Sequence, residues 1–229
     1  MQYFLDGYRS GDPRIHPLAE GRSAKQGPLP EEVDVLIVGT GPAGLLLAAQ
    51  LSTFPEIVTR VVEKAEGPLE VGRADGIACR TVEMFEAFGL AERMTSEAYW
   101  VNETHFWGPA PGDKARITRL GRVQDVRDGL SEFPHVIVNQ ARLLDFLLEY
   151  MHNSPSRLQV DYSHETVKVE VPEAAGERVT VTLNTPDGEV TVRAKHVVGC
   201  DGAHSVVRDS IGRMPQGHGE DKAWGVMDV

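Results

Sequence analysis

Near its start the chain reads Val33-Asp-Val-Leu-Ile-Val-Gly39-Thr-Gly41-Pro-Ala-Gly44-Leu-Leu-Leu-Ala-Ala-Gln50. This stretch joins an aliphatic run, a G-x-G-x-x-G turn and a helix-forming run without interruption. A second aliphatic run, over residues 57–62, ends on Glu63, which lies 24 residues after Gly39. The order strand, glycine turn, helix, strand and acid is typical of a βαβ unit that binds a dinucleotide.

Each part of this unit has a physical role in holding a nucleotide. Gly39 permits the tight turn, Gly41 lets the backbone approach a pyrophosphate, and Gly44 lets the helix pack close to the sheet. Free N–H groups at the helix N-terminus point toward the phosphate charge, and the Glu63 carboxylate can accept hydrogen bonds from ribose hydroxyls. A lone G-x-G-x-x-G also occurs in structural turns, but its register with strand, helix and acid favours nucleotide binding.

Composition and charge restrict the class of protein. The chain has 229 residues, 41% hydrophobic and 25% charged, which predicts a soluble globular protein of one domain plus part of another. Its net charge of -11 argues against nucleic acid or an anionic membrane as the main partner. We expect a cytoplasmic protein, because no apolar run could cross a bilayer and the first 30 residues lack a signal-peptide core.

Cysteine and histidine spacing gives no indication of a metal centre. Cys79 and Cys200 are far apart and form no C-x-x-C, which fits a reducing compartment. The eight histidines show no spacing typical of metal ligands, so we expect no metal.

The remaining chain alternates between helical and strand-like patterns. Residues 1–32, rich in Gly, Pro and charge, indicate an extended arm. Apolar periodicity predicts helices and strands over the following segments. Helices are expected at 81–89, 140–151 and 203–211, and strands at 136–138 and 196–200, with short strand-like pieces over 99–120. Three alternating runs, at 167–171, 179–183 and 190–192, predict an antiparallel meander.

A second informative stretch follows the meander and reads Val197-Val-Gly-Cys-Asp201-Gly202-Ala-His-Ser205-Val-Val-Arg208. A strand brings an Asp-Gly pair to the start of a helix, where Asp201 could accept from a sugar-alcohol hydroxyl or simply cap the helix. Behind a nucleotide-binding unit and a meander, the pair resembles the D-G motif of single-component FAD-dependent aromatic hydroxylases.

Three other segments strengthen this resemblance. Gly72-Arg73-Ala74-Asp75-Gly76-Ile-Ala-Cys-Arg80-Thr81, Asn139-Gln140-Ala-Arg-Leu-Leu and Trp224-Gly-Val-Met-Asp-Val are similar to the phenol 2-monooxygenase and 3-hydroxybenzoate 4-monooxygenase branch. Family members are far longer and carry a second Gly-Asp flavin motif. We therefore expect this chain to be an N-terminal portion that is inactive by itself.

The resemblance implies an α/β fold, with a Rossmann-like FAD-binding domain, a β-meander and the beginning of a smaller β-rich substrate domain. The implied division is an N-terminal arm at 1–32, an FAD-binding domain at 33–98 and 132–215, and substrate-domain parts at 99–131 and 216–229.

By the same resemblance, the nucleotide is FAD, and its binding residues can be named. The pyrophosphate would lie against Gly39, Gly41, Pro42, Ala43 and Gly44. Glu63 would hold the adenosine ribose, with Lys64 beside the adenosine, and Arg73 would reach the phosphates. Gln140 and Asp201 would contact the ribityl chain. For Arg73 and Gln140 a solvated surface contact is the alternative.

The implied reaction is hydroxylation of a phenolic ring. NADPH or NADH reduces the flavin, O₂ adds to give a C4a-hydroperoxide, and oxygen is transferred ortho or para to the phenolic oxygen. Asp75 matches the substrate-side aspartate that accepts the phenol proton, although it could be a turn-forming residue. His135 could bind a benzoate carboxylate or be a structural histidine. The implied partners are a small aromatic substrate, O₂ and, for the full-length protein, further copies of itself.

Two other interpretations remain from the sequence. One is an NAD-dependent dehydrogenase built on the same βαβ unit, against which the meander and the D-G pair argue. The other is an inactive fragment that folds partly and retains FAD weakly or not at all.

Overall fold

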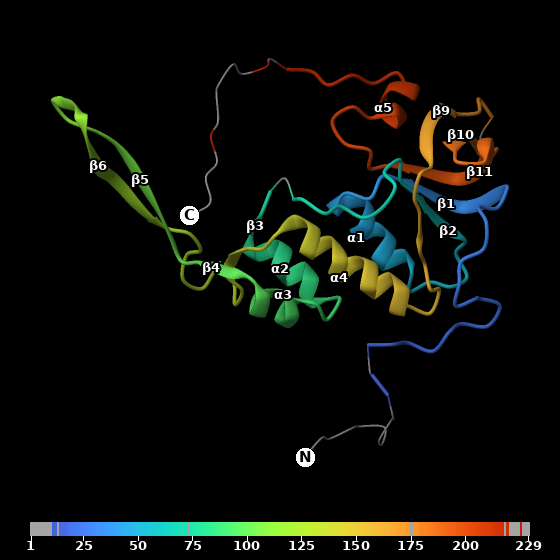
Figure 1. The fold of residues 1–229 in the computed structure, drawn as a ribbon, viewed down its shortest axis with the longest axis horizontal. Helices are drawn as coiled ribbons and strands as arrows, with labels where there is room; N and C mark the ends of the chain where they lie inside the picture. The colour runs from blue at the N-terminus through green and yellow to red at the C-terminus, as the bar shows by residue number, and fades with distance from the viewer. Residues whose placement is uncertain are drawn as a thin grey trace.

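A computed structural model of the chain describes residues 11–12, 14–72, 74–174, 176–217, 219 and 225 (Figure 1). The largest sheet within these residues has six strands in the order β8-β2-β1-β11-β10-β9. These strands are β1 (Glu32–Val38), β2 (Thr59–Val62), β8 (Val160–Asp161), β9 (Glu165–Glu170), β10 (Val179–Thr185) and β11 (Gly188–Gly199). The strands β8, β2, β1 and β11 run parallel to one another. Strand β10 pairs antiparallel with β11 on one side and with β9 on the other.

Helices cover one face of the sheet. The helices α1 (Pro42–Leu51) and α4 (Gln140–Asn153) lie against it, with α2 (Cys79–Glu86) and α3 (Ala91–Glu97) beside α4 (Figure 1). Their apolar side chains form a core with the sheet, in which Ile37, Leu45, Val61, Phe146 and Met151 are buried. Burial of this apolar surface is the main favourable contribution to folding.

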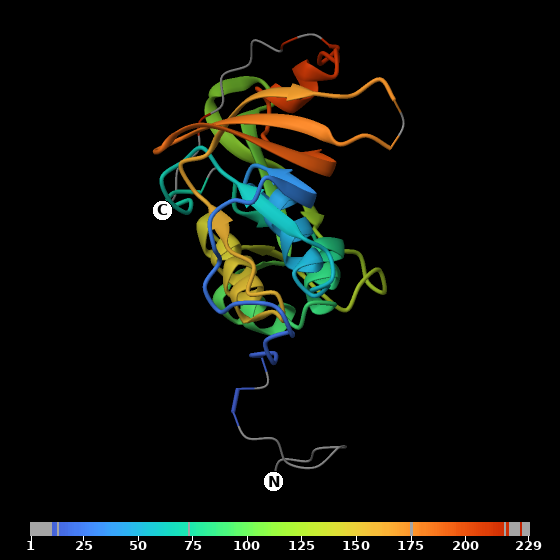
Figure 2. The same cartoon turned by 90° about the vertical axis from the view of Figure 1, so that its right-hand side faces the viewer.

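The meander covers the opposite face. Strands β9 and β10 and the first half of β11 curve over β1 and β2, so that β1 and β2 lie between the helices and the meander (Figure 2). Leu36 and Val62 pack there against Val181 and Leu183, and Val207 of α5 (Val206–Ser210) joins the same cluster. The α/β fold with a β-meander expected from the sequence is thereby confirmed.

A small antiparallel sheet lies beside the N-terminal end of α4. Its order is β3-β7-β4, with β3 (Gly76–Ile77) and β4 (Tyr99–Val101) on either side of β7 (His135–Ile137). Ile77 pairs with Val136, and Val101 pairs with His135. This sheet ties the loop that contains Asp75 to the strand that contains His135.

A long hairpin projects from the body of the molecule. It consists of β5 (Glu103–Ala110) and β6 (Asp113–Gln124), and Figure 1 shows it extending well beyond the helices. Large apolar side chains on it face solvent. They are Phe106, Trp107, Ile117, Leu120 and Val123.

The N-terminal arm is fixed to the sheet by a buried ion pair. Over residues 14–31 the arm contains neither helix nor strand. Arg60 of β2 forms a 2.5 Å ion pair with Asp161 of β8 and donates to the carbonyl oxygens of Gly27 and Pro28. Gln26 donates to Asp161 as well. The arm is therefore part of the packed structure where it passes the edge of the sheet.

Several expected boundaries were wrong. The meander run at 190–192 and the strand at 196–200 are one continuous strand, β11. The helix expected at 203–211 covers only Val206–Ser210, because Gly202 has a φ of 81° and Ser205 caps the helix instead of lying in it. The helix expected at 81–89 is Cys79–Glu86, and α3 was not predicted.

Candidate functional site

The glycine loop lies where β1 and β11 end side by side. The Cys200 N–H donates to the Val38 carbonyl at 2.7 Å, which holds the two strand ends together. A Cβ on Gly39, whose φ is 100°, would lie 2.5 Å from the Cys200 oxygen, and one on Gly44 would lie 2.0 Å from the Gly39 oxygen. Both glycines are therefore required by the protein's own backbone.

Gly41 is different, because the space around it is open. A Cβ there would meet no atom within 4 Å, and its φ of -66° is available to any residue. Gly41 caps α1 without a side-chain hydrogen bond, and Pro42 follows at the first helical position. The N-terminus of α1 thus opens onto free space, an arrangement that fits a phosphate group.

Glu63 connects the end of β2 to this loop. Its Oε2 accepts from the Thr40 N–H at 3.0 Å and from the Thr40 hydroxyl at 2.8 Å, and its Oε1 accepts from the Ala65 N–H at 2.9 Å. A carboxylate has about four acceptor positions, so these three bonds leave room for a ribose hydroxyl. Thr40 stands at a variable position of G-x-G-x-x-G, so no motif predicts its role.

Hydrogen bonds keep Glu63 ionised. Burial by itself would raise its pKa, but the bonds from Ala65 and Thr40, together with the charge of Lys64, lower the pKa overall. Lys64 is exposed next to it. Tyr162 is affected in the opposite way, because burial, followed by the charges of Glu63 and Asp145, raises its pKa to about 12. A negative carboxylate and a neutral phenol therefore occur near the end of β2.

Asp201 follows Cys200 at the end of β11, next to Gly39 of the glycine loop. Its Oδ1 accepts from the Ser205 hydroxyl at 2.5 Å and its Oδ2 accepts from the Val207 N–H at 3.2 Å. Ser205 in turn caps α5 by accepting from the Arg208 N–H. A Cβ on Gly39 would lie 3.1 Å from the Asp201 Cα. Asp201 thus both shapes the loop before α5 and stands beside the open phosphate loop.

The loop before β3 lies against the start of α4. Gln140 is the first residue of α4, after Asn139, whose side chain caps the helix by accepting from the Ala141 N–H. A Cβ on Gly72 would lie 2.9 Å from the Gln140 Cβ, so the two segments touch. Arg73 lies outside the described residues.

The small sheet joins the backbone of Asp75 to the strand that contains His135. The Asp75 carbonyl accepts from the Val138 N–H at 2.9 Å, and the Asp75 side chain is half-buried. A Cβ on the next residue, Gly76, would lie 3.2 Å from His135 Nε2. The sheet therefore links the backbones of the two segments in which a substrate contact is expected.

His135 has a carboxylate partner that sequence reasoning missed. Its Nδ1 lies 2.6 Å from Oδ2 of Asp125, and the two side chains are 28% and 22% exposed. Asp125 follows β6 in a loop, and no motif marks it. The two residues are ten positions apart in the sequence, and the folded chain brings their side chains together.

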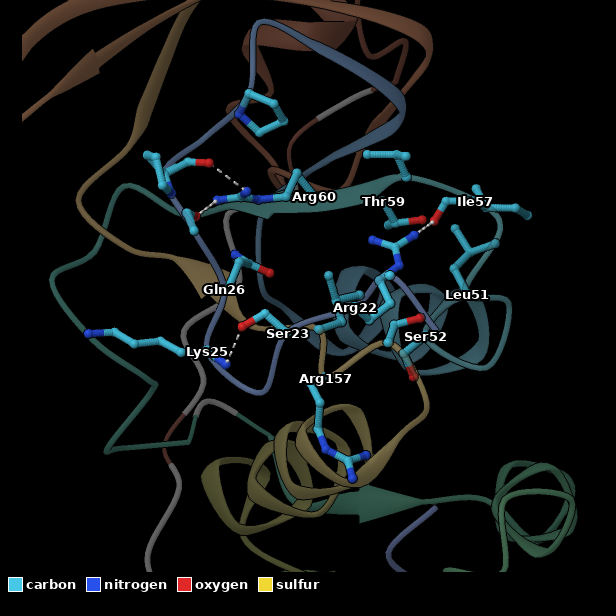
Figure 3. Close-up of a pocket in the computed structure, with 17 residues that line it drawn as sticks. Arg22, Ser23, Lys25, Gln26, Leu51, Ser52, Ile57, Thr59, Arg60 and Arg157 are labelled. Atoms are coloured by element: carbon cyan, nitrogen blue, oxygen red, sulfur yellow. Dashed lines mark hydrogen bonds between the residues drawn. The ribbon is translucent and has the colours of Figure 1, made fainter. Parts of the chain in front are cut away.

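Two cavities differ in their position relative to the candidate residues. One, of about 240 Å³, lies between the arm and β2 and is lined by residues such as Arg22, Thr59 and Arg60 (Figure 3). None of the candidate site residues lines it. A larger cavity of about 730 Å³ adjoins β4 and the hairpin, and Gln124 and Pro134, the neighbours of Asp125 and His135, line it. This second cavity opens beside the pair.

The described residues contain neither a candidate metal cluster nor a candidate membrane-spanning helix. Within them, no cluster of three His, Cys, Asp or Glu side chains is placed to bind a metal ion. Of the helices in that part of the chain, none is both long enough and sufficiently apolar to cross a bilayer.

Known proteins match both the sequence and the fold. The family described as FAD binding domain matches residues 32–229. A 3-hydroxybenzoate 4-monooxygenase from Comamonas testosteroni is 54% identical over 235 residues, which cover 100% of this chain and 37% of that protein. The phenol 2-monooxygenase fsqG from Aspergillus fumigatus is 32% identical, with 87% of this chain and 33% of that protein covered.

A solved structure agrees with these relatives. The flavin-dependent monooxygenase PieE, crystallised with FAD and substrate, superposes with a TM-score of 0.66 at 27% identity, over 79% of this chain and 32% of that one. The chain spans about a third of the length of these relatives. It belongs to the family described as FAD binding domain.

Proposed function

We propose that this chain is the FAD-binding part of a monooxygenase that hydroxylates a phenolic ring, with a 3-hydroxybenzoate-like compound as substrate. The observation that carries the proposal is the open space at Gly41, at the N-terminus of α1, which fits a phosphate group. The 54% identity to a 3-hydroxybenzoate 4-monooxygenase over the whole chain supports the substrate class. O₂ and NADPH or NADH would be the co-substrates.

The open N-terminus of α1 supports the proposed FAD contacts. The pyrophosphate would be held there by Gly39, Gly41, Pro42, Ala43 and Gly44. Glu63 accepts from the adenosine ribose with its remaining acceptor position, and Lys64 lies beside the adenosine. The ribityl chain would contact Gln140 and Asp201, and the family resemblance assigns Arg73 to the phosphates. When bound, the flavin supplies the activation of O₂ and the transfer of one oxygen atom.

The protein's own contribution is to orient the ring and move the phenol proton. In this proposal Asp75 accepts the proton of the substrate hydroxyl, which makes the ring carbons ortho and para to it more nucleophilic. A free phenol has a pKa of about 10, so a nearby carboxylate acceptor is useful at neutral pH. His135 binds the substrate carboxylate from the neighbouring strand.

We also propose a division into domains. Residues 33–98 and 132–215 form the FAD-binding domain, residues 1–32 form the arm, and residues 99–131 and 216–229 belong to the substrate domain. The projection of the β5–β6 hairpin from the body, with its exposed apolar side chains, supports the assignment of 99–131. Most of 216–229 and of 1–10 lies outside the described residues.

A simple phenol without a carboxylate is the second candidate substrate. The 32% identity to a phenol 2-monooxygenase favours it. In that case Asp75 keeps its role, and His135 has no anion to bind.

The proposal is tested by Asp75→Asn in the full-length flavoprotein that carries this chain. An amide cannot take up the phenol proton, so the product formed per NAD(P)H oxidised should fall about 100-fold or more, while FAD stays bound. Asp187→Asn, in the turn between β10 and β11, is the matched control and should hydroxylate normally. If Asp75→Asn gives the same product yield as Asp187→Asn, Asp75 is only a turn residue.

A further inference from the structure

Thr40, in the glycine loop, holds the Glu63 carboxylate with two hydrogen bonds. Its N–H donates to Oε2 at 3.0 Å, and its hydroxyl donates to the same oxygen at 2.8 Å. Both distances are typical of well-formed hydrogen bonds. Since the acceptor is ionised, each bond is stronger than one between two neutral groups. Thr40 therefore helps to determine where this carboxylate lies.

The backbone on both sides of this contact is fixed. The Gly39 N–H donates to the Val62 carbonyl at 2.9 Å, which ties the glycine loop to the end of β2. The Glu63 N–H donates to the Asp161 carbonyl at 3.0 Å. The side chains of Thr40 and Glu63 are half-buried, so a carboxylate without these bonds would gain rotamer freedom. The bonds from Thr40 remove that freedom.

The bonds within the protein leave one acceptor position on the carboxylate. Oε2 accepts two bonds from Thr40, and Oε1 accepts one from the Ala65 N–H at 2.9 Å. An ionised carboxylate has about four acceptor positions, two on each oxygen, so the open position is on Oε1. Thr40 directly precedes Gly41, whose surroundings are open. The oriented carboxylate is therefore joined to the loop at which the pyrophosphate is proposed.

We propose that Thr40 is a positioning residue of the FAD site, which holds Glu63 so that Oε1 accepts from a hydroxyl of the adenosine ribose. This inference rests on the proposed function, because it requires the contact between Glu63 and the ribose. Thr40 acts through Glu63, since its N–H and its hydroxyl both donate to Oε2. Every residue except proline would supply the N–H, whereas the hydroxyl requires Thr or Ser at this position.

The test measures the FAD affinity of variants of the full-length flavoprotein that carries this chain. Thr40→Val replaces the hydroxyl by a methyl group and keeps the N–H bond, whereas Thr40→Ser keeps both bonds. We expect Thr40→Val to bind FAD about 10-fold more weakly, the size of one hydrogen bond to a charged group, and Thr40→Ser to bind within about 2-fold of the wild type. Thr53→Val is the matched control and should bind FAD normally, because the Thr53 hydroxyl donates to the Gln50 carbonyl, outside the glycine loop.

A double-mutant cycle determines whether Thr40 acts through Glu63. Glu63→Ala removes the carboxylate, so Thr40→Val should cause no further loss of FAD affinity in the Glu63→Ala background. Equal losses in the wild-type and Glu63→Ala backgrounds would mean that Thr40 affects FAD by another route, and would overturn the inference. Circular dichroism checks that each variant is folded, and Thr40→Ala, which also lacks the hydroxyl, takes the place of Thr40→Val if the valine prevents folding.

The outcomes separate this inference from the proposed function. A loss in Thr40→Val that is absent from Thr40→Ser and from the Glu63→Ala background supports both. Wild-type FAD affinity in Glu63→Ala overturns the contact between Glu63 and the ribose, and this inference with it. Weak binding by Glu63→Ala with wild-type affinity in Thr40→Val overturns the role of Thr40 alone. Equally weak binding by Thr40→Ser and Thr40→Val also overturns it, because the hydroxyl would then have no effect.

Discussion

At the scale of single residues, the three glycines of the phosphate loop serve two different purposes. Gly39 and Gly44 are needed because a Cβ would collide with backbone atoms of the protein itself. Gly41 has neither a left-handed backbone nor a close neighbour, so only a bound group would be affected by a side chain there. The sequence predicted a role for each of the three from one motif, and the structure adds which protein atoms a side chain at each position would meet.

Two residues near the site could not have been predicted from the sequence. Thr40 bonds to Glu63 from a position where the motif accepts any residue. Asp125, in the loop after β6, contacts His135 at the start of β7. No periodic pattern in the sequence predicts a contact between residues ten positions apart through a loop. Motifs report the residues that a ligand needs, whereas these two residues support other side chains.

The bonds to Glu63 predict a pH dependence of stability. Its pKa is lower in the folded chain than the ordinary value of 4.5, so the ionised form stabilises the fold. That contribution is fully present above pH 4.5 and is lost as the pH falls through the lower pKa of the folded state. The free energy of unfolding of Glu63→Gln should therefore fall less than that of the wild type as the pH is lowered from neutral to below 4.5.

The measurement is urea unfolding at a series of pH values, with Glu66→Gln as the control at an exposed carboxylate three residues along. The control should follow the wild-type profile. If Glu63→Gln shows the same acid dependence as the wild type, the bonds from Thr40 and Ala65 do not stabilise the ionised form.

At the scale of elements, the sequence predicted the βαβ unit, α4 and the meander well, because each has a clear apolar period. It divided β11 in two, since Arg193 and Lys195 interrupt the apolar run. In the structure these cations alternate with buried Val192 and Ala194 and form ion pairs with acids of β1. Helix α3 has only two buried residues, Ala91 and Met94, and therefore gave too weak a period to be seen.

The contact between β2 and β8 predicts a large effect from one substitution. The side chains of Arg60 and Asp161 are only 8% and 13% exposed. Asp161→Asn leaves the Arg60 charge buried without a counter-ion, and removal of one partner of a buried pair costs about 3–5 kcal/mol. Urea unfolding should show a loss of about this size.

An exposed ion pair provides the comparison. Lys168 and Glu170 are 61% and 53% exposed, and Glu170→Gln should cost less than about 1 kcal/mol. Similar small losses for Asp161→Asn and Glu170→Gln would mean that the arm and the edge of the sheet are not held by the buried pair.

At the scale of the whole molecule, the layers place the proposed cofactor and substrate positions near one another. Helices on one face and the meander on the other leave the carboxyl ends of β1, β2 and β11 accessible, which is where open α/β sheets bind ligands. The α4 helix begins beside Gly72, in the loop that leads to Asp75. The fold class could be predicted from one motif, whereas this arrangement required the packing of distant segments.

The most direct test of the whole account is a titration of this chain with FAD, followed by flavin fluorescence, for the wild type and for Gly41→Val. Since no protein atom lies near a Cβ at position 41, the variant should fold, with an unchanged circular dichroism spectrum. It loses the glycine cap, at a cost of about 1 kcal/mol, which lowers its unfolding temperature by roughly 2–4 °C. We predict one bound FAD per wild-type chain and at least about 100-fold weaker binding by the variant. Equal FAD affinity of a folded Gly41→Val chain and the wild type would contradict the account.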